Sequence, residues 1–198
     1  MLKTNTKIRY LLITNYLQLF AFSFFNPLFA LYVLHLGAKP EIIGVAWGVN
    51  MYAAALTILL FGRYENQNSN KERLVVLGYF VLAAGAASFL LVSNVWQLLV
   101  VQIVNAVGLG MMTPAWRTAY AQSEDKGKEI MEWSLVDGGG RFFIATGAMV
   151  GSLIYKYFGF HGIFILIALV QLIAAVISLQ LLKPPAVLHK EPIPLGPL

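Results

Sequence analysis

The stretch GRYENQNSNKER, residues 62–73, lies between two long apolar stretches at residues 42–61 and 74–92. A helix that crosses a bilayer needs about 20 mainly apolar residues, so each flanking stretch is long enough to span a membrane. A short hydrophilic segment between two such spans stays on one side of the membrane. Its basic residues Arg63, Lys71 and Arg73 outnumber its acidic ones. The 62–73 segment therefore predicts a membrane protein and also indicates its orientation.

The composition agrees with a chain surrounded mainly by lipid. Hydrophobic residues make up 59% of the 198 residues and charged residues only 12%, whereas ordinary soluble domains carry roughly 25% charged residues. The formal net charge is +5, but the basic residues lie at the ends of apolar runs and form no stripe of the kind that binds nucleic acid. The first apolar run, residues 10–34, is longer than a signal-peptide core and predicts a retained first helix.

The sequence contains no motif for catalysis or for metal binding. It has no cysteine, and its three histidines (His35, His161 and His189) are too scattered to match a metal-ligand spacing. An H-E-x-x-H pattern, a P-loop and a G-x-S-x-G pattern are all missing. We therefore expect no enzymatic activity, no metal and no cofactor. The expected partners are the lipid bilayer and a small-molecule solute.

Six segments are long and apolar enough to be spanning helices, which predicts an all-α membrane protein with one bundle over residues 1–182. The predicted spans are residues 10–35, 42–61, 74–92, 95–116, 134–155 and 163–182. The charged link 117–133 predicts a helix that lies at the membrane surface. Residues 183–198 are rich in proline and form a predicted cytoplasmic tail.

The distribution of basic residues predicts which side of the membrane each link faces. The termini, the 62–73 segment and the 117–133 link, together with the start of the fifth span, hold twelve Lys and Arg residues. The opposite side holds only Lys39 and Lys156. Because positively charged links stay in the cytoplasm, we predict that both termini are cytoplasmic and that the protein lies in the inner or plasma membrane.

Several stretches resemble the major facilitator superfamily of transporters. HLGAKPEIIG (residues 35–44) resembles that family's turn into its second helix, and YKYFGFHGIF (residues 155–164) resembles its fifth-to-sixth passage. The family's loop after the second helix reads G-x-x-x-D-R-x-G-R-R. At the same spacing, this chain has Gly62, Asn66, Gln67, Ser69, Asn70 and Lys71. The resemblance covers residues 10–182 and implies one six-helix bundle of a fold that normally contains two.

Polar residues recur on one face of the first and fourth predicted spans. Asn15, Gln18, Phe22 and Asn26 share a face of the first span, and Gln102, Asn105, Thr113 and Trp116 share a face of the fourth. Intramembrane polar residues are costly unless they face a cavity or a partner. In the resembled family these two helices line the substrate cavity, so we predict a solute pathway here. The alternative is that the amides join helices by hydrogen bonds.

Two further groups of residues follow from the resemblance. A cytoplasmic gate would contain Gly62, Asn66, Lys71, Arg117, Asp137 and Arg141, with Asp137 and Arg141 able to pair across one helical turn. A glycine stripe on the fifth span, formed by Gly140, Gly147 and Gly151, predicts a contact with a second bundle. The alternative for this stripe is tight packing within the same bundle.

These features predict transmembrane transport of a small solute by alternating access. One bundle cannot rock against itself, so the predicted assembly is a homodimer or a pair with a second six-span half. The alternative function is that of a non-transporting remnant or an accessory membrane subunit bound to another transporter. A module of a nucleotide-driven exporter is disfavoured because the links of this chain are short.

Overall fold

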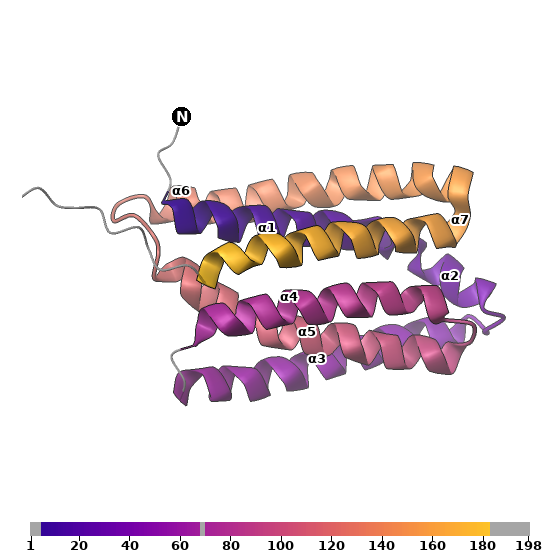
Figure 1. Ribbon diagram of the computed structural model, residues 1–198. Helices are drawn as coiled ribbons and strands as arrows, with labels where there is room; N and C mark the ends of the chain where they lie inside the picture. Colours follow the sequence, from indigo (N-terminus) through magenta and orange to yellow (C-terminus); the bar gives the residue numbers. More distant parts are fainter. Residues whose placement is uncertain (1–4, 68–69, 183–198) are drawn as a thin grey trace, which may run out of the picture.

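Long helices make up the described part of this computed structural model, which comprises residues 5–67 and 70–182. Figure 1 shows most of them aligned along one axis as a bundle. The elements are α1 (Thr6–Ser23), η1 (Asn26–Leu28), α2 (Phe29–His35), α3 (Glu41–Gln67), α4 (Lys71–Ser88), η2 (Phe89–Leu91), α5 (Val95–Ala121), α6 (Glu129–Ser134), η3 (Leu135–Gly139), α7 (Gly140–Ser178) and η4 (Leu179–Leu182). Five helical stretches in the described residues are long and apolar enough to cross a membrane: 6–35, 41–64, 71–91, 95–121 and 129–182. The predicted all-helical class is confirmed.

The longest stretch reverses direction at Gly159, where φ is 61° and ψ is −164°. A positive φ favours glycine because it has no Cβ to meet the neighbouring backbone. Figure 1 shows α7 running to one end of the bundle and then returning. The predicted fifth and sixth spans therefore lie on two arms of α7, residues 140–158 and 160–178. Only Gly159 leaves the helix where the sequence predicts a connection over residues 159–162.

The first predicted span is interrupted rather than continuous. α1 ends at Ser23, a 3-10 turn follows with Pro27 near its start, and α2 begins at Phe29. Proline has no N–H to donate into the preceding turn, and its ring displaces a carbonyl there, which breaks the helix. The second predicted span is longer than expected, because α3 continues past Phe61 to Gln67. Most of the 62–73 segment is thus helical, with α4 beginning at Lys71. The side chain of Asn66 and the tail 183–198 lie outside the described residues.

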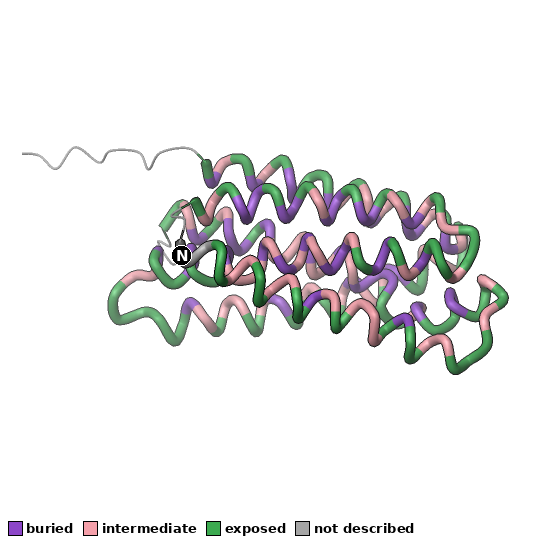
Figure 2. Tube along the Cα trace, turned by 90° about the horizontal axis from the view of Figure 1, so that it is seen from below, coloured by how far each residue is buried: buried purple, intermediate pink, exposed green. Residues whose placement is uncertain are grey.

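The helices pack in two groups that share α4. α5 packs against α3 and α4, while α1 and α4 pack against α7. Figure 2 shows buried positions recurring along the helices between exposed ones, as amphipathic packing requires. The buried apolar side chains form two clusters. The first apolar cluster includes Leu11, Tyr79, Met112, Trp116 and Ala174. The second apolar cluster includes Ala21, Phe25, Leu98, Phe164 and Ile167.

Both ends of the described chain lie at the same end of the bundle. Figure 1 shows the start of α1, the end of α3, the start of α4, the α5–α6 link and the end of the last helical segment together on the left. Lys7 Nζ lies 2.7 Å from Glu72 Oε1, and Asn5 Nδ2 donates to the Ser123 carbonyl oxygen at 3.4 Å. These contacts tie the start of α1 to α4 and to the end of α5. The membrane side that this end faces stays a prediction.

Candidate solute pathway

The polar face of α1 is only partly accessible. Asn15 and Phe22 are half-buried and Asn26, in the 3-10 turn, is exposed. Gln18 is 6% exposed and points into the bundle. On the predicted polar face, Asn15 and Asn26 are thus at least partly accessible from outside the bundle, whereas Gln18 is buried.

Two of the predicted residues of α5, Gln102 and Trp116, join that helix to its neighbours. Asn50 Nδ2 of α3 donates to the Gln102 carbonyl oxygen at 3.0 Å and to Gln102 Oε1 at 3.4 Å. Asn105 Nδ2 donates to the Val101 carbonyl oxygen at 2.9 Å. The side chains of Gln102 and Asn105 are buried, and Thr113 is half-buried. Gln102 therefore joins two helices by hydrogen bonds, as the alternative predicts, and does not line an open pathway. The sequence does not identify Asn50 of α3 as the partner of Gln102, because periodicity does not show which helix a face meets.

Trp116 connects α5 to α1. Its Nε1–H donates to the Leu11 carbonyl oxygen at 3.1 Å, and its ring stacks on Tyr120 with centroids 5.0 Å apart. Tyr120 in turn donates from its hydroxyl to the Glu132 carbonyl oxygen at 2.7 Å, and Tyr16 donates to the Leu135 carbonyl oxygen at 2.5 Å. These bonds hold α1, α5 and the segment before α7 together at the end of the bundle that carries the termini.

Replacing Trp116 with phenylalanine should lower the free energy of unfolding. Phenylalanine keeps a ring beside Tyr120 but has no N–H for the Leu11 carbonyl. We expect a loss of at least about 1 kcal/mol, the net worth of a typical protein hydrogen bond. Thermal unfolding in detergent measures this loss. Trp96→Phe is the control, because Trp96 is 77% exposed and should melt like the wild type. An unchanged melting temperature for Trp116→Phe would show that the bond contributes nothing.

The predicted pair of Asp137 and Arg141 does not form. Both residues are exposed, and the ion pairs within the described residues join Lys7 to Glu72 and Lys128 to Asp125. Residues 135–139 form a π-helical turn. Because both side chains are exposed, pairing would gain little over separate solvation by water, and nothing in the local structure holds the pair together. Of the other predicted gate residues, Arg117 is exposed, whereas Gly62 and Lys71 are half-buried.

The glycine stripe of α7 packs inside the bundle. Gly147 lies against Phe20 and Ser23 of α1, and Gly151 lies against the backbone of Phe24. Gly140 faces the side chain of Leu19. These contacts match the alternative stated for the stripe, which is tight packing within the same bundle. Because α1 covers this face, it has no room for a second bundle.

α3 carries glycines that meet no other part of the described residues. A Cβ added at Gly44, Gly48 or Gly62 would have no neighbour within 4 Å. These positions share a face with the exposed residue Ala55. Only 11% of the apolar window of α3 is buried, against 39–56% in the other four spans of the described residues. Among the long helices, α3 therefore has the least of its surface covered by its own chain.

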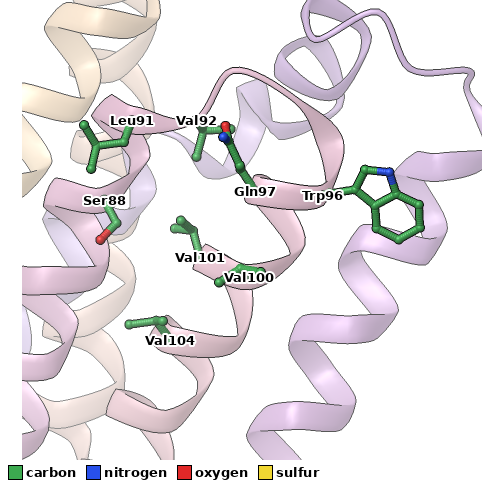
Figure 3. A pocket seen from close by; sticks show the side chains of 8 residues that line it. All are labelled: Ser88, Leu91, Val92, Trp96, Gln97, Val100, Val101 and Val104. Atoms are coloured by element: carbon green, nitrogen blue, oxygen red, sulfur yellow. The ribbon is translucent and has the colours of Figure 1, made fainter.

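A groove of about 410 Å³ lies between the end of α4 and the start of α5. Figure 3 shows its lining, which is formed by Ser88, Leu91, Val92, Trp96, Gln97, Val100, Val101 and Val104. The lining is mostly aliphatic. Leu91, Trp96 and Val100 are 77%, 77% and 60% exposed, so the groove opens on the outer surface of the bundle. It contains none of the predicted pathway residues.

Comparison with known sequences places the chain in a family. The Major Facilitator Superfamily profile matches residues 11–197, and the chain belongs to that superfamily. It is 28% identical over 151 residues to the riboflavin transporter RibZ of Clostridioides difficile, a match that covers 71% of this chain and 31% of RibZ. It is 27% identical over 175 residues to a putative sugar efflux transporter of Deinococcus radiodurans, covering 85% of this chain and 43% of that protein.

Solved transporter structures share the fold. The in meso crystal structure of the POT family transporter PepTSo superposes with a TM-score of 0.66 at 17% identity, covering 96% of this chain and 40% of that one. An auto-inhibited POT family peptide transporter gives a TM-score of 0.71 at 15% identity, covering 98% and 39%. The chain thus spans less than half the length of each of these relatives. The match with the superfamily confirms the resemblance seen in the sequence, and transport across a membrane is the function that this class supports.

Proposed function

We propose that this chain is one six-helix bundle of a carrier that moves a small neutral solute across the inner or plasma membrane by alternating access. The observation that carries the proposal is the superfamily match over residues 11–197, which reaches into all five membrane-spanning stretches. With the reversal at Gly159, the last stretch supplies two crossings and the bundle has six. In such carriers, two bundles rock around a site near the bilayer midplane.

The proposed solute path runs along the accessible polar residues Asn15, Asn26 and Thr113. An amide both donates and accepts hydrogen bonds, which suits hydroxyl groups. In the described spans, acidic residues lie only near the ends: Glu41, Glu72, Glu129, Glu132 and Asp137. A path without a midplane carboxylate favours a neutral solute. The names of two relatives, a riboflavin transporter and a putative sugar efflux transporter, support a solute that carries several hydroxyl groups.

Reconstituted protein tests the activity directly. Proteoliposomes should accumulate riboflavin, which is detected by its fluorescence, or a radiolabelled sugar at a rate above that of empty liposomes. Efflux from preloaded vesicles tests the opposite direction. Assembly without flux of either solute would favour the alternative function, an accessory subunit that binds another transporter.

We further propose that the second bundle is a second copy of the chain, and that the face of α3 with Gly44, Gly48, Ala55 and Gly62 forms the contact. Glycines spaced in this way let two helix backbones approach closely, which is a main source of helix association in lipid. Gly147 and Gly151 already have close neighbours on α1, whereas a Cβ at Gly44, Gly48 or Gly62 would meet no atom of the described part of the chain within 4 Å.

A cysteine at the centre of this face should cross-link two copies. The chain has no native cysteine, so Ala55→Cys introduces a single thiol. In a two-fold symmetric dimer the same surface patch meets itself, which brings equivalent residues near the axis close together. We expect a disulfide-linked dimer after mild oxidation in native membranes, seen on a gel without reductant. Val100→Cys, on the outer surface of α5, is the control and should stay monomeric. Cross-linking of Val100→Cys alone, or of neither variant, would contradict the proposed contact.

A further inference from the structure

The groove between the end of α4 and the start of α5 runs along the two helices. It begins beside the α4–α5 link, at Leu91 and Trp96, and ends at Val104, and Figure 3 shows its lining residues following one another down α5. At a rise of about 1.5 Å per residue, the distance from Trp96 to Val104 is about 12 Å. One leaflet is about 15 Å thick, half of a hydrocarbon core of about 30 Å. With its link end at the membrane surface, the groove therefore reaches most of the way to the bilayer midplane.

The lining of the groove suits a hydrocarbon chain. Leucine and valine side chains form most of the lining, and no lining residue is charged. The Ser88 hydroxyl donates to the Ala84 carbonyl oxygen at 2.8 Å, and Gln97 Oε1 accepts from the Ser93 N–H at 2.7 Å. These two polar groups are thus bonded within their own segments, and a molecule in the groove would contact mainly apolar carbon atoms.

The groove is continuous with a surface that faces lipid. The chain belongs to a superfamily of transporters, and α4 and α5 are both long and apolar enough to span the bilayer. Leu91 and Val100 are 77% and 60% exposed, and residues 74–116 contain no charged side chain. Trp96, at the link end, is 77% exposed, and tryptophan is enriched at the level of the lipid headgroups. A lipid can therefore enter sideways, with its headgroup beside the link and its chain directed toward Val104.

We propose that the groove holds one acyl chain of a bilayer lipid, in the leaflet nearest the α4–α5 link. Its volume of about 410 Å³ lies in the range of pockets that enclose small ligands, and its length matches a chain that extends from the surface toward the midplane. A spanning helix is about 10–12 Å across with its side chains, so a second copy would lie over the groove without filling it. Because residues 74–116 carry no charge, recognition depends on the acyl chain and not on the headgroup.

Photo-crosslinking of the wild-type protein in liposomes tests the proposal. The probe is phosphatidylcholine with a diazirine in the middle of one acyl chain, which on illumination attaches to the residue that it touches. The reference surface is the second arm of α7 around Leu169, which is 53% exposed. Leu169 lies about 15 Å along the helix from Gly159, at the same end of the bundle as the α4–α5 link (Figure 1).

We expect mass spectrometry to find severalfold more label in residues 88–104 than around Leu169. Equal labelling would show that the groove holds no chain in preference to other lipid-facing surfaces. Weaker labelling would show that protein covers the groove. Either of these results would overturn the proposal.

A larger side chain at the deep end of the groove tests the same proposal by substitution. Val104→Trp should fill that end and lower the labelling of residues 88–104 severalfold, to the level around Leu169. Ile103→Trp is the matched control, because Ile103 is 44% exposed and lies outside the lining, and its labelling should equal that of the wild type. Undiminished labelling in folded Val104→Trp protein would overturn the proposal. If this variant does not fold, the comparison of the two surfaces in the wild type still decides.

Discussion

Gly151→Leu is expected to prevent the bundle from folding. A Cβ at this position would overlap the backbone of Phe24, and a leucine adds three more carbon atoms in the same place. Side chains can rotate away from an inserted group, at a cost of about 1–3 kcal/mol for overpacking, but a helix backbone can only shift as a whole. α1 would have to move off α7, which would expose part of both apolar clusters. The measurement is the yield of monodisperse protein in size-exclusion chromatography, followed by its melting temperature.

Gly44→Leu is the matched control for this experiment. It makes the same change on another membrane helix, but a Cβ at Gly44 meets no atom within 4 Å. We expect this variant to fold and melt like the wild type while losing self-association through α3. If Gly151→Leu is produced and melts like the wild type, α1 does not pack on α7 as described. If Gly44→Leu fails to fold, α3 contributes to the stability of the single bundle.

Asn15→Leu is expected to reduce solute flux about tenfold, which corresponds to the loss of one hydrogen bond of about 1.4 kcal/mol to the moving solute. Asn15 is half-buried on the accessible face of α1, and its side chain has no hydrogen-bond partner within the described residues. Its amide is therefore free to bond a solute, and its replacement breaks no bond within the bundle. The initial rate of uptake into proteoliposomes measures the effect.

The control for Asn15→Leu must separate transport from folding. Ile13→Leu lies two residues away at a position 41% exposed and should change neither flux nor stability. Asn15→Leu should melt like the wild type, because leucine is apolar and no bond within the chain is lost. Unchanged flux in this variant would show that the solute path does not pass α1 at this level.

Much of the fold was predictable because lipid imposes simple rules. Long apolar runs marked the helices, and Gly159 was recognisable as part of a connection. The periodicity of α1 and α5 also identified the faces on which polar residues gather. Periodicity gives the direction of a side chain from its own helix, but not the identity of the helix that it meets. Gln102 shares its face with the predicted pathway residues, yet it bonds to Asn50 of α3.

Other predictions failed because they depend on which helices become neighbours and on how exposed the side chains are. A small-residue stripe favours close packing with any helix, so Gly147 and Gly151 could not indicate that α1 of the same chain is their neighbour. Asp137 and Arg141 have the spacing of an ion pair, but both side chains are exposed, where pairing gains little over solvation by water. The sequence analysis singled out no stripe on α3. The structure shows that the face with Gly44 and Gly48 is left uncovered by the described residues.

The reversal at Gly159 has a mechanical consequence. The two arms of α7 are joined by one non-helical residue, so this end of the pair has no slack. A tilt of the first arm must therefore carry the start of the second arm with it. The opposite ends of the arms are anchored separately, the first through the π turn to α6 and the second to η4 at the end of the described chain. The two arms are therefore held together at Gly159. They can separate only at their other ends, which lie at the end of the bundle where the described chain begins and ends.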